Sequence, residues 1–129
     1  MSKILPSLHK LCYIDENNEL ILNCLSFKQI ATNELYDVII QHILETIQTN
    51  ILIMNVITAH MYMKSFTLTD FEKHLPFITK LCKMLTLNFP DKLEKCLIYN
   101  APFFISKIYN VLSSFIDKKT QQKIKIISL

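Results

Sequence analysis

Apolar and polar positions along the chain follow two periods, one typical of helices and one typical of strands. Between residues 33 and 50 the apolar residues recur every four positions, which places them on one face of a helix. We expect this helix to begin at Asn33, whose side chain can cap it, and to end near Thr49. A second helix is expected over residues 69–87, interrupted or kinked at Pro76.

Short apolar runs between the helices predict strands. Residues 19–27 alternate in part and indicate a strand near a sheet edge. Residues 51–54 form a continuous apolar run, which is typical of a strand buried on both faces. Further strands are expected at 95–99 and 124–127, separated by a helix over 102–116. This order predicts an α/β fold with a mostly parallel sheet and right-handed crossover helices.

Composition then narrows the class of protein. With 129 residues, we expect a single domain over residues 1–129. The chain is 50% hydrophobic and has no glycine, so it carries more apolar surface than a domain of this size usually needs. The surplus forms either an isoleucine-rich but ordinary core, or the lining of a cavity, groove or interface.

Charge and cysteine usage limit the partners. The net charge is +3 and all of the positive side chains are lysines. The chain thus has no arginine to make bidentate hydrogen bonds to phosphate or guanine, and we expect no nucleic acid partner. Weak attraction to anionic membranes remains, but no apolar run approaches the ~20 residues that span a bilayer. The four cysteines form no Cys-x-x-Cys pair, which favours reduced thiols. We therefore expect a cytoplasmic protein, and the charge and hydropathy suit one that associates peripherally with membranes.

Catalytic motifs are missing from the sequence. A chain without glycine excludes the P-loop, the dinucleotide-binding loop and the Gly-x-Ser-x-Gly elbow. Its cysteines and histidines are scattered, which argues against a metal site. A Cys–His or carboxylate pair could still converge in space, but we expect a binding protein with no cofactor rather than an enzyme.

The predicted helix over 102–116 is apolar on more than one face. A helix of this kind in so small a domain can hardly be enclosed by protein on all sides. We therefore expect a lipid chain, a bilayer or a partner protein to supply the missing contact. A sixteen-carbon tail would contribute roughly 12 kcal/mol before ordering costs, against about 1 kcal/mol for a hydrogen bond.

The junction before this helix is a second candidate site. Asn100 can cap the helix and Pro102 fits its first turn. Ligands of open α/β sheets bind at the carboxyl ends of strands, and helix N-termini favour anions. On spacing alone, a well-formed turn without a ligand is the better explanation of these residues.

Several motifs follow one another in the C-terminal half. They are the turn Phe89-Pro90-Asp91-Lys92, the strand 95–99, the segment Asn100-Ala101-Pro102-Phe103, the apolar helix, and a turn led by Asp117 that continues to Thr120 and Lys123. This ordered set resembles the CRAL-TRIO lipid-binding domain, in particular the phosphatidylinositol/phosphatidylcholine transfer proteins. The resemblance is clearest over residues 77–127.

The resemblance implies an apolar pocket that holds one phospholipid, with the segment 103–117 as its movable gate. It also implies that Asp91, Thr120 and Lys123 bind a phosphoinositide head group, with Lys123 neutralising a phosphate. The implied contacts of the gate and the lipid tail are Phe103, Phe104, Ile108, Tyr109, Leu112, Phe115 and Ile116. Without the resemblance, the three head-group residues would be explained as a cap, a turn residue and a solvated charge.

The chain departs from the family pattern at both ends. About fourteen residues precede the first predicted strand, where the family has a helical lobe, and the family's glycine-rich tail has no counterpart. Asp91 is one methylene shorter than the usual glutamate. We therefore expect a minimal, truncated CRAL-TRIO domain whose exposed apolar walls a homodimer would cover.

These observations support two functional hypotheses. In the first, the domain binds a single lipid, a phosphoinositide or another phospholipid, and carries or presents it between membranes that it touches transiently. In the second, it is a protein-interaction module, a dimer or a partner scaffold, that keeps the fold without lipid transfer. The first hypothesis expects a hollow beneath the gate, and the second expects a filled core.

Overall fold

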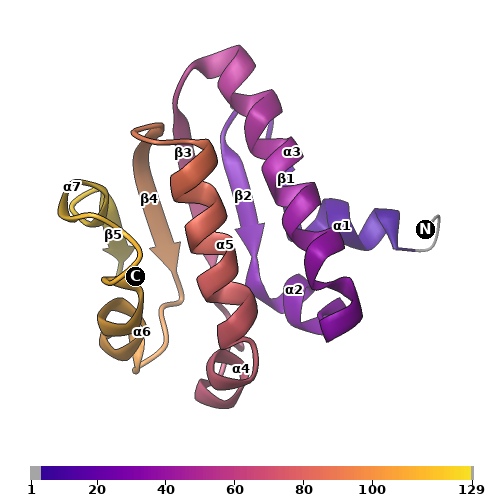
Figure 1. The fold of residues 1–129 in the computed structure, drawn as a ribbon, viewed down its shortest axis with the longest axis vertical. Helices are drawn as coiled ribbons and strands as arrows, with labels where there is room; N and C mark the ends of the chain where they lie inside the picture. Colours follow the sequence, from indigo (N-terminus) through magenta and orange to yellow (C-terminus); the bar gives the residue numbers. More distant parts are fainter. Residues whose placement is uncertain (1–3, 129) are drawn as a thin grey trace.

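Five strands form one sheet, and two long helices lie across one of its faces (Figure 1). The computed structural model describes residues 4–128. The strands stand in the order β1-β2-β3-β4-β5, with β1 antiparallel to β2 and every other neighbouring pair parallel. Their bounds are Cys12–Ile14, Leu20–Asn23, Ile57–Tyr62, Leu93–Tyr99 and Ile124–Ile127. The predicted α/β class with a mostly parallel sheet is thus confirmed.

Seven α-helices and one 3₁₀ turn connect the strands of the described part of the chain. The longest are α3 and α5, which run beside each other in front of the sheet in Figure 1. The α-helices are α1 Leu5–Leu11, α2 Cys24–Ile30, α3 Tyr36–Met54, α4 Leu68–Lys73, α5 Leu75–Asn88, α6 Ile105–Leu112 and α7 Lys118–Gln121, and the 3₁₀ turn is Asn33–Leu35.

The predicted strand at 51–54 is wrong. These residues form the last turn of α3, in which Ile51 continues the four-residue spacing of Ile43 and Ile47. Asn55 ends the helix in a left-handed conformation with φ 68°, and its N–H donates to the carbonyl of Ile51 at 2.7 Å. The buried strand β3 therefore begins at Ile57.

Two other boundaries also shift. The strand predicted over 19–27 stops at Asn23, whose side chain accepts a hydrogen bond from the N–H of Ser26 and caps α2. The helix predicted over 69–87 divides into α4 and α5 at His74, and Pro76 stands in the first turn of α5, where it removes no helical hydrogen bond. The strand predicted over 124–127 is confirmed.

A chain without glycine must place other residues where the backbone turns left-handed. The positive φ angles among the described residues belong to Asn18, Asn55, Ser65, Asp91 and Asn100. Asn and Asp tolerate this region because their short polar side chains bond the local backbone. Serine lacks that advantage, so the turn at Ser65, between β3 and α4, is the least favourable of the five.

We expect Ser65→Gly to raise the free energy of unfolding by about 1 kcal/mol, because it removes the Cβ that crowds the left-handed backbone. The Ser65 side chain is exposed, so little packing is lost. Urea unfolding followed by circular dichroism measures the change. Ser65→Ala keeps the Cβ and should bring no gain; equal gains for both variants would contradict the argument.

Candidate functional site

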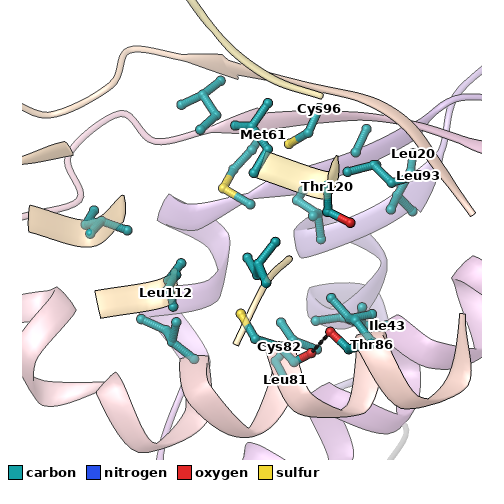
Figure 2. Close-up of a pocket in the computed structure, with 18 of the residues that line it drawn as sticks. Leu20, Ile43, Met61, Leu81, Cys82, Thr86, Leu93, Cys96, Leu112 and Thr120 are labelled. Atoms are coloured by element: carbon teal, nitrogen blue, oxygen red, sulfur yellow. Dashed lines mark hydrogen bonds between the residues drawn. The ribbon is translucent and has the colours of Figure 1, made fainter. Parts of the chain in front are cut away.

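A cavity of about 430 Å³ lies between the helices and the sheet. Its floor is the inner face of the central strands, where alternate side chains point inward. Its walls come from α3 and α5, and Figure 2 shows Ile43, Leu81 and Cys82 of these helices lining it opposite Leu20, Met61 and Cys96 of the sheet. The lining is almost entirely apolar.

Helix α6 closes one side of this cavity, and we refer to α6 as the gate helix. Its inward positions Ile105, Ile108, Tyr109 and Leu112 line the cavity at a spacing of three and four residues. Its outward positions Ser106, Lys107 and Asn110 are polar and exposed. The gate helix is therefore amphipathic, and its apolar face looks into a hollow.

The expectation of a helix that is apolar all round is thus corrected. The regular helix spans only Ile105–Leu112, so Phe103 precedes it and Phe115 follows it. The aromatic residues that made the segment 102–116 look apolar on several faces belong to flanking turns. The apolar surface of α6 that needs a further contact therefore lies on its inner face.

The predicted gate and tail residues therefore divide into two groups. Ile108, Tyr109, Leu112 and Ile116 line the cavity. The other three do not: Phe103 is 92% exposed, Phe104 is buried with its ring 6.4 Å from that of Phe71, and the ring of Phe115 lies 5.2 Å from the Lys83 ammonium.

The mouth of the cavity is marked by the lining residues that are themselves exposed. These are Thr86 and the turn residues Pro90 and Asp91 on one side, and Ser113 and Asp117 on the other. The mouth thus opens between the C-terminal part of α5 and the segment that joins α6 to α7.

Three contacts close over this mouth. The Thr86 hydroxyl donates to the carbonyl of Phe115 at 3.3 Å, and the same hydroxyl donates to Cys82 within its own helix. The Lys83 ammonium sits over the Phe115 ring. Lys119 lies 3.6 Å from Asp91, with about two-thirds of each side chain exposed. Exposed interactions of these kinds each contribute about 1 kcal/mol or less.

Of the predicted head-group residues, the structure brings two to the cavity. Asp91 and Thr120 both line it, and they lie just before β4 and β5 respectively. Lys123 is not part of the lining, since its ammonium donates to the carbonyl of Leu93 at 2.7 Å. The register of β5 beside β4 sets this contact, and the sequence gives no sign of it.

Asp117, which sequence reasoning took only as the start of a turn, is part of the mouth. Its carboxylate caps α7 by accepting from the N–H of Thr120 at 2.7 Å. This hydrogen bond holds the pKa of the Asp117 carboxyl below its usual range.

The alternative site at the carboxyl end of β4 finds no support. Asn100 adopts a left-handed turn with φ 56° and does not cap the gate helix, which is preceded by Phe104. Neither Asn100 nor Pro102 lines the cavity. Asp91 and Thr120 of the lining lie instead near the amino ends of β4 and β5, whereas Asn23 lines the cavity from the carboxyl end of β2.

Three cysteines of the lining were also missed. Cys24, Cys82 and Cys96 contribute sulfur to the cavity wall. Burial raises the pKa of the Cys24 thiol to about 12 and those of Cys82 and Cys96 to about 11. For Cys96, alternation along β4 was the available signal, because Cys96 and Ile98 occupy the same face of that strand.

Within residues 4–128, no group of three or more His, Cys, Asp or Glu side chains is placed to hold a metal ion. In the same part of the chain, no helix is long and apolar enough to cross a membrane.

Comparison with solved structures shows the fold. A structure described as "Crystal structure of Sfh5" superimposes with a TM-score of 0.73 and 14% sequence identity, and the match covers 94% of this chain and 50% of that one. The chain thus corresponds to half the length of that neighbour. A search of curated proteins finds no match.

The family assignment rests on a match to a family model that covers nearly the whole chain. A family model described as "CRAL/TRIO domain" matches residues 11–129, which include all five strands. Lipid binding is the general role that this family supports, and an apolar cavity under an amphipathic helix agrees with it. The chain therefore belongs to the CRAL/TRIO domain family.

Proposed function

We propose that this domain holds one lipid, with its tail in the cavity and its head at the mouth, and carries it between membranes. The observation that supports this best is the apolar cavity of about 430 Å³ beneath the gate helix. Each methylene that leaves water for the cavity contributes about 0.8 kcal/mol. Summed over a chain of several carbons, this contribution exceeds that of any single polar contact at the mouth.

A phosphoinositide head group would need a rearrangement of Lys123. Asp91 and Thr120 are placed to meet a head group at the mouth. The Lys123 ammonium, however, would have to exchange the Leu93 carbonyl for a phosphate. Lys123 would belong to the head-group set only in this rearranged state.

The gate is suited to opening. The contacts that close the mouth are exposed and each contributes about 1 kcal/mol or less, so they add little resistance to opening. By contrast, Ile39, Ile43 and Ile47 of α3 are almost fully buried against the rest of the core. A lipid would therefore enter by displacement of α6 and α7 rather than of α3.

An apolar ridge lies at the same end of the domain as the mouth. We define it as Leu52, Ile53 and Met54 of α3 and Leu87 of α5, with exposed fractions of 77%, 59%, 45% and 77%. Asn55, directly after α3, accepts a hydrogen bond from the Lys92 ammonium at 3.2 Å. This bond joins the end of α3 to the turn that carries Asp91.

We propose that this apolar ridge contacts an anionic bilayer while the lipid is exchanged. Lys118 and Lys119 are exposed on α7 beside the mouth, and Lys92 lies beside the ridge. Near an anionic surface each lysine contributes about 1 kcal/mol. The ridge would enter the interface and the lysines would meet lipid phosphates, so the protein would associate peripherally with membranes.

The interaction-module hypothesis expects a filled core, and the cavity does not agree with it. A homodimer through the apolar ridge is the specific form that the exposed residues could still support. It would bury the side chains that membrane contact requires, so the two uses of the ridge exclude each other.

Filling the cavity should abolish lipid binding. In Leu112→Trp the larger side chain occupies space beneath the gate helix, so we expect lipid recovered from the purified protein to fall at least several-fold. Organic extraction followed by mass spectrometry measures the lipid-to-protein ratio. Asn110→Trp, on the exposed face of the same helix, is the matched control and should retain lipid. Equal lipid content in both variants, or none in the unaltered protein, would contradict the proposal.

Charging the apolar ridge should weaken membrane contact without unfolding the protein. For Leu52→Glu combined with Ile53→Glu, we expect binding to phosphatidylserine-containing vesicles to fall about tenfold or more, with unchanged thermal stability. Vesicle co-sedimentation measures this. The control is Phe103→Glu, at the opposite end of β4, where we expect no loss. A monomer–dimer shift in the double variant, with vesicle binding intact, would favour the homodimer.

The cavity thiols should report occupancy. Because burial raises the pKa of Cys82 to about 11, alkylation by iodoacetamide should be slow at pH 8 and rise about tenfold per pH unit up to pH 10. Loading the delipidated protein with a palmitoyl lipid should slow this labelling several-fold further. Cys12, which is buried outside the cavity lining, should label equally slowly with and without lipid. Peptide mass spectrometry separates the two sites, and faster labelling of Cys82 after loading would be the opposing result.

A further inference from the structure

The size of the cavity bears on how many lipid chains it holds. An apolar protein cavity of about 150 Å³ is enough for benzene, with its six carbons. In proportion, a cavity of about 430 Å³ accepts on the order of 17 non-hydrogen atoms. That is one long acyl or alkyl chain, and a diacyl lipid brings about twice as many chain carbons.

The polar groups of the mouth bear on the head group. Most of its side-chain donors, Thr120 apart, are already used within the protein: Ser113 donates to the carbonyl of Asn110 at 2.8 Å, and Gln121 donates to that of Ile116 at 2.6 Å. The Thr86 hydroxyl is shared between two carbonyls, those of Cys82 and Phe115. An anionic head would therefore find few free donors among the lining residues.

Acceptors, in contrast, remain available. The lining contains two carboxylates, Asp91 and Asp117, and no lysine. Lys119 lies beside Asp91, but at 3.6 Å and with two-thirds of its side chain in solvent it offsets only part of this charge. A head that donates hydrogen bonds, such as a hydroxyl or an ammonium group, fits this mouth, whereas a phosphate or carboxylate head would be repelled by the two aspartates.

We infer that the cavity selects a single-chain amphiphile whose hydroxylated head is neutral or cationic. This inference rests on the proposed lipid-binding function and narrows its ligand class. The chain fills the space between α5, α6 and the sheet, and the hydroxyl groups donate to Asp91 and Asp117. A diacyl lipid would leave its second chain outside the cavity, in contact with water.

Four palmitoyl lipids separate chain number from head charge: monopalmitoylglycerol, palmitate, dipalmitoylglycerol and dipalmitoyl phosphatidylinositol. The full chain, delipidated, is offered equimolar mixtures of these probes, and native mass spectrometry counts each complex. We expect one monopalmitoylglycerol per protein, preferred about tenfold or more over palmitate and over both two-chain lipids. Stoichiometric binding of a two-chain lipid, or preference for palmitate, would overturn the inference while leaving the lipid-binding proposal intact. Binding of none of the four would overturn both.

A double variant tests whether the two aspartates select the head group. Asp91→Asn combined with Asp117→Asn keeps a residue that tolerates the left-handed turn and a side chain that caps α7. We expect this variant to bind palmitate and monopalmitoylglycerol with affinities within about threefold of each other, because the repelling carboxylates are gone. Its thermal stability should match that of the unaltered protein. Unchanged discrimination against palmitate in a folded variant would show that the two aspartates do not select the head group.

Discussion

The structure depends on an apolar space that the chain does not fill with its own side chains. In protein cores an empty cavity costs about 24 cal/mol for each Å³, so a dry space of about 430 Å³ would cost on the order of 10 kcal/mol. That is comparable to the whole stability of a typical domain. Water does not relieve this cost well, because the walls offer it few hydrogen-bond partners. A long hydrocarbon chain matches both the volume and the chemistry of the space, so such a ligand would act as a missing part of the core.

A cavity that needs a ligand would explain why α3 is fixed to the sheet while the gate helix α6 can move. The inner face of α3 is packed on the sheet through Ile39, Ile43 and Ile47. The gate helix instead turns its apolar face toward the cavity and is held at the mouth by exposed contacts. The stability of the closed gate therefore depends on what the cavity contains. Occupancy would favour closure, and an approaching bilayer, which offers the gate helix another apolar environment, would favour opening.

Much of the fold could be predicted from the sequence because period and order are local signals. The four-residue spacing in α3 and the alternation of strands with helices predicted the class of the sheet. The error at 51–54 arose because a short apolar run fits a buried strand when it is considered by itself, although Ile51 continues the four-residue spacing of Ile43 and Ile47. No glycine was present to mark the turn at Asn55, where the helix ends.

The cavity was harder to predict, because its residues come together only in the folded sheet. Ile108, Tyr109 and Leu112 were named only through the family resemblance, because a segment that is apolar on more than one face does not separate them from Phe103 or Phe115. The separation of Lys123 from the cavity depends instead on the pairing of β5 with β4, where the N–H of Cys96 donates to the carbonyl of Lys123 at 2.9 Å and the ammonium turns to Leu93. No local pattern encodes that register.

The position of the mouth is a consequence of the same pairing. Strands β4 and β5 are parallel, so the turns that lead into them meet at one end of the sheet, and this brings Asp91 and Thr120 together although they are far apart in sequence. The ridge at the end of α3 reaches this end too, through the bond between Asn55 and Lys92. The lining carries two acidic side chains and the lysines lie outside it. In the proposed function, the outer charges would attract an anionic surface and the inner ones would repel an anionic head. A lipid-binding site arranged in this way would approach an anionic membrane without retaining the anionic lipids that form it.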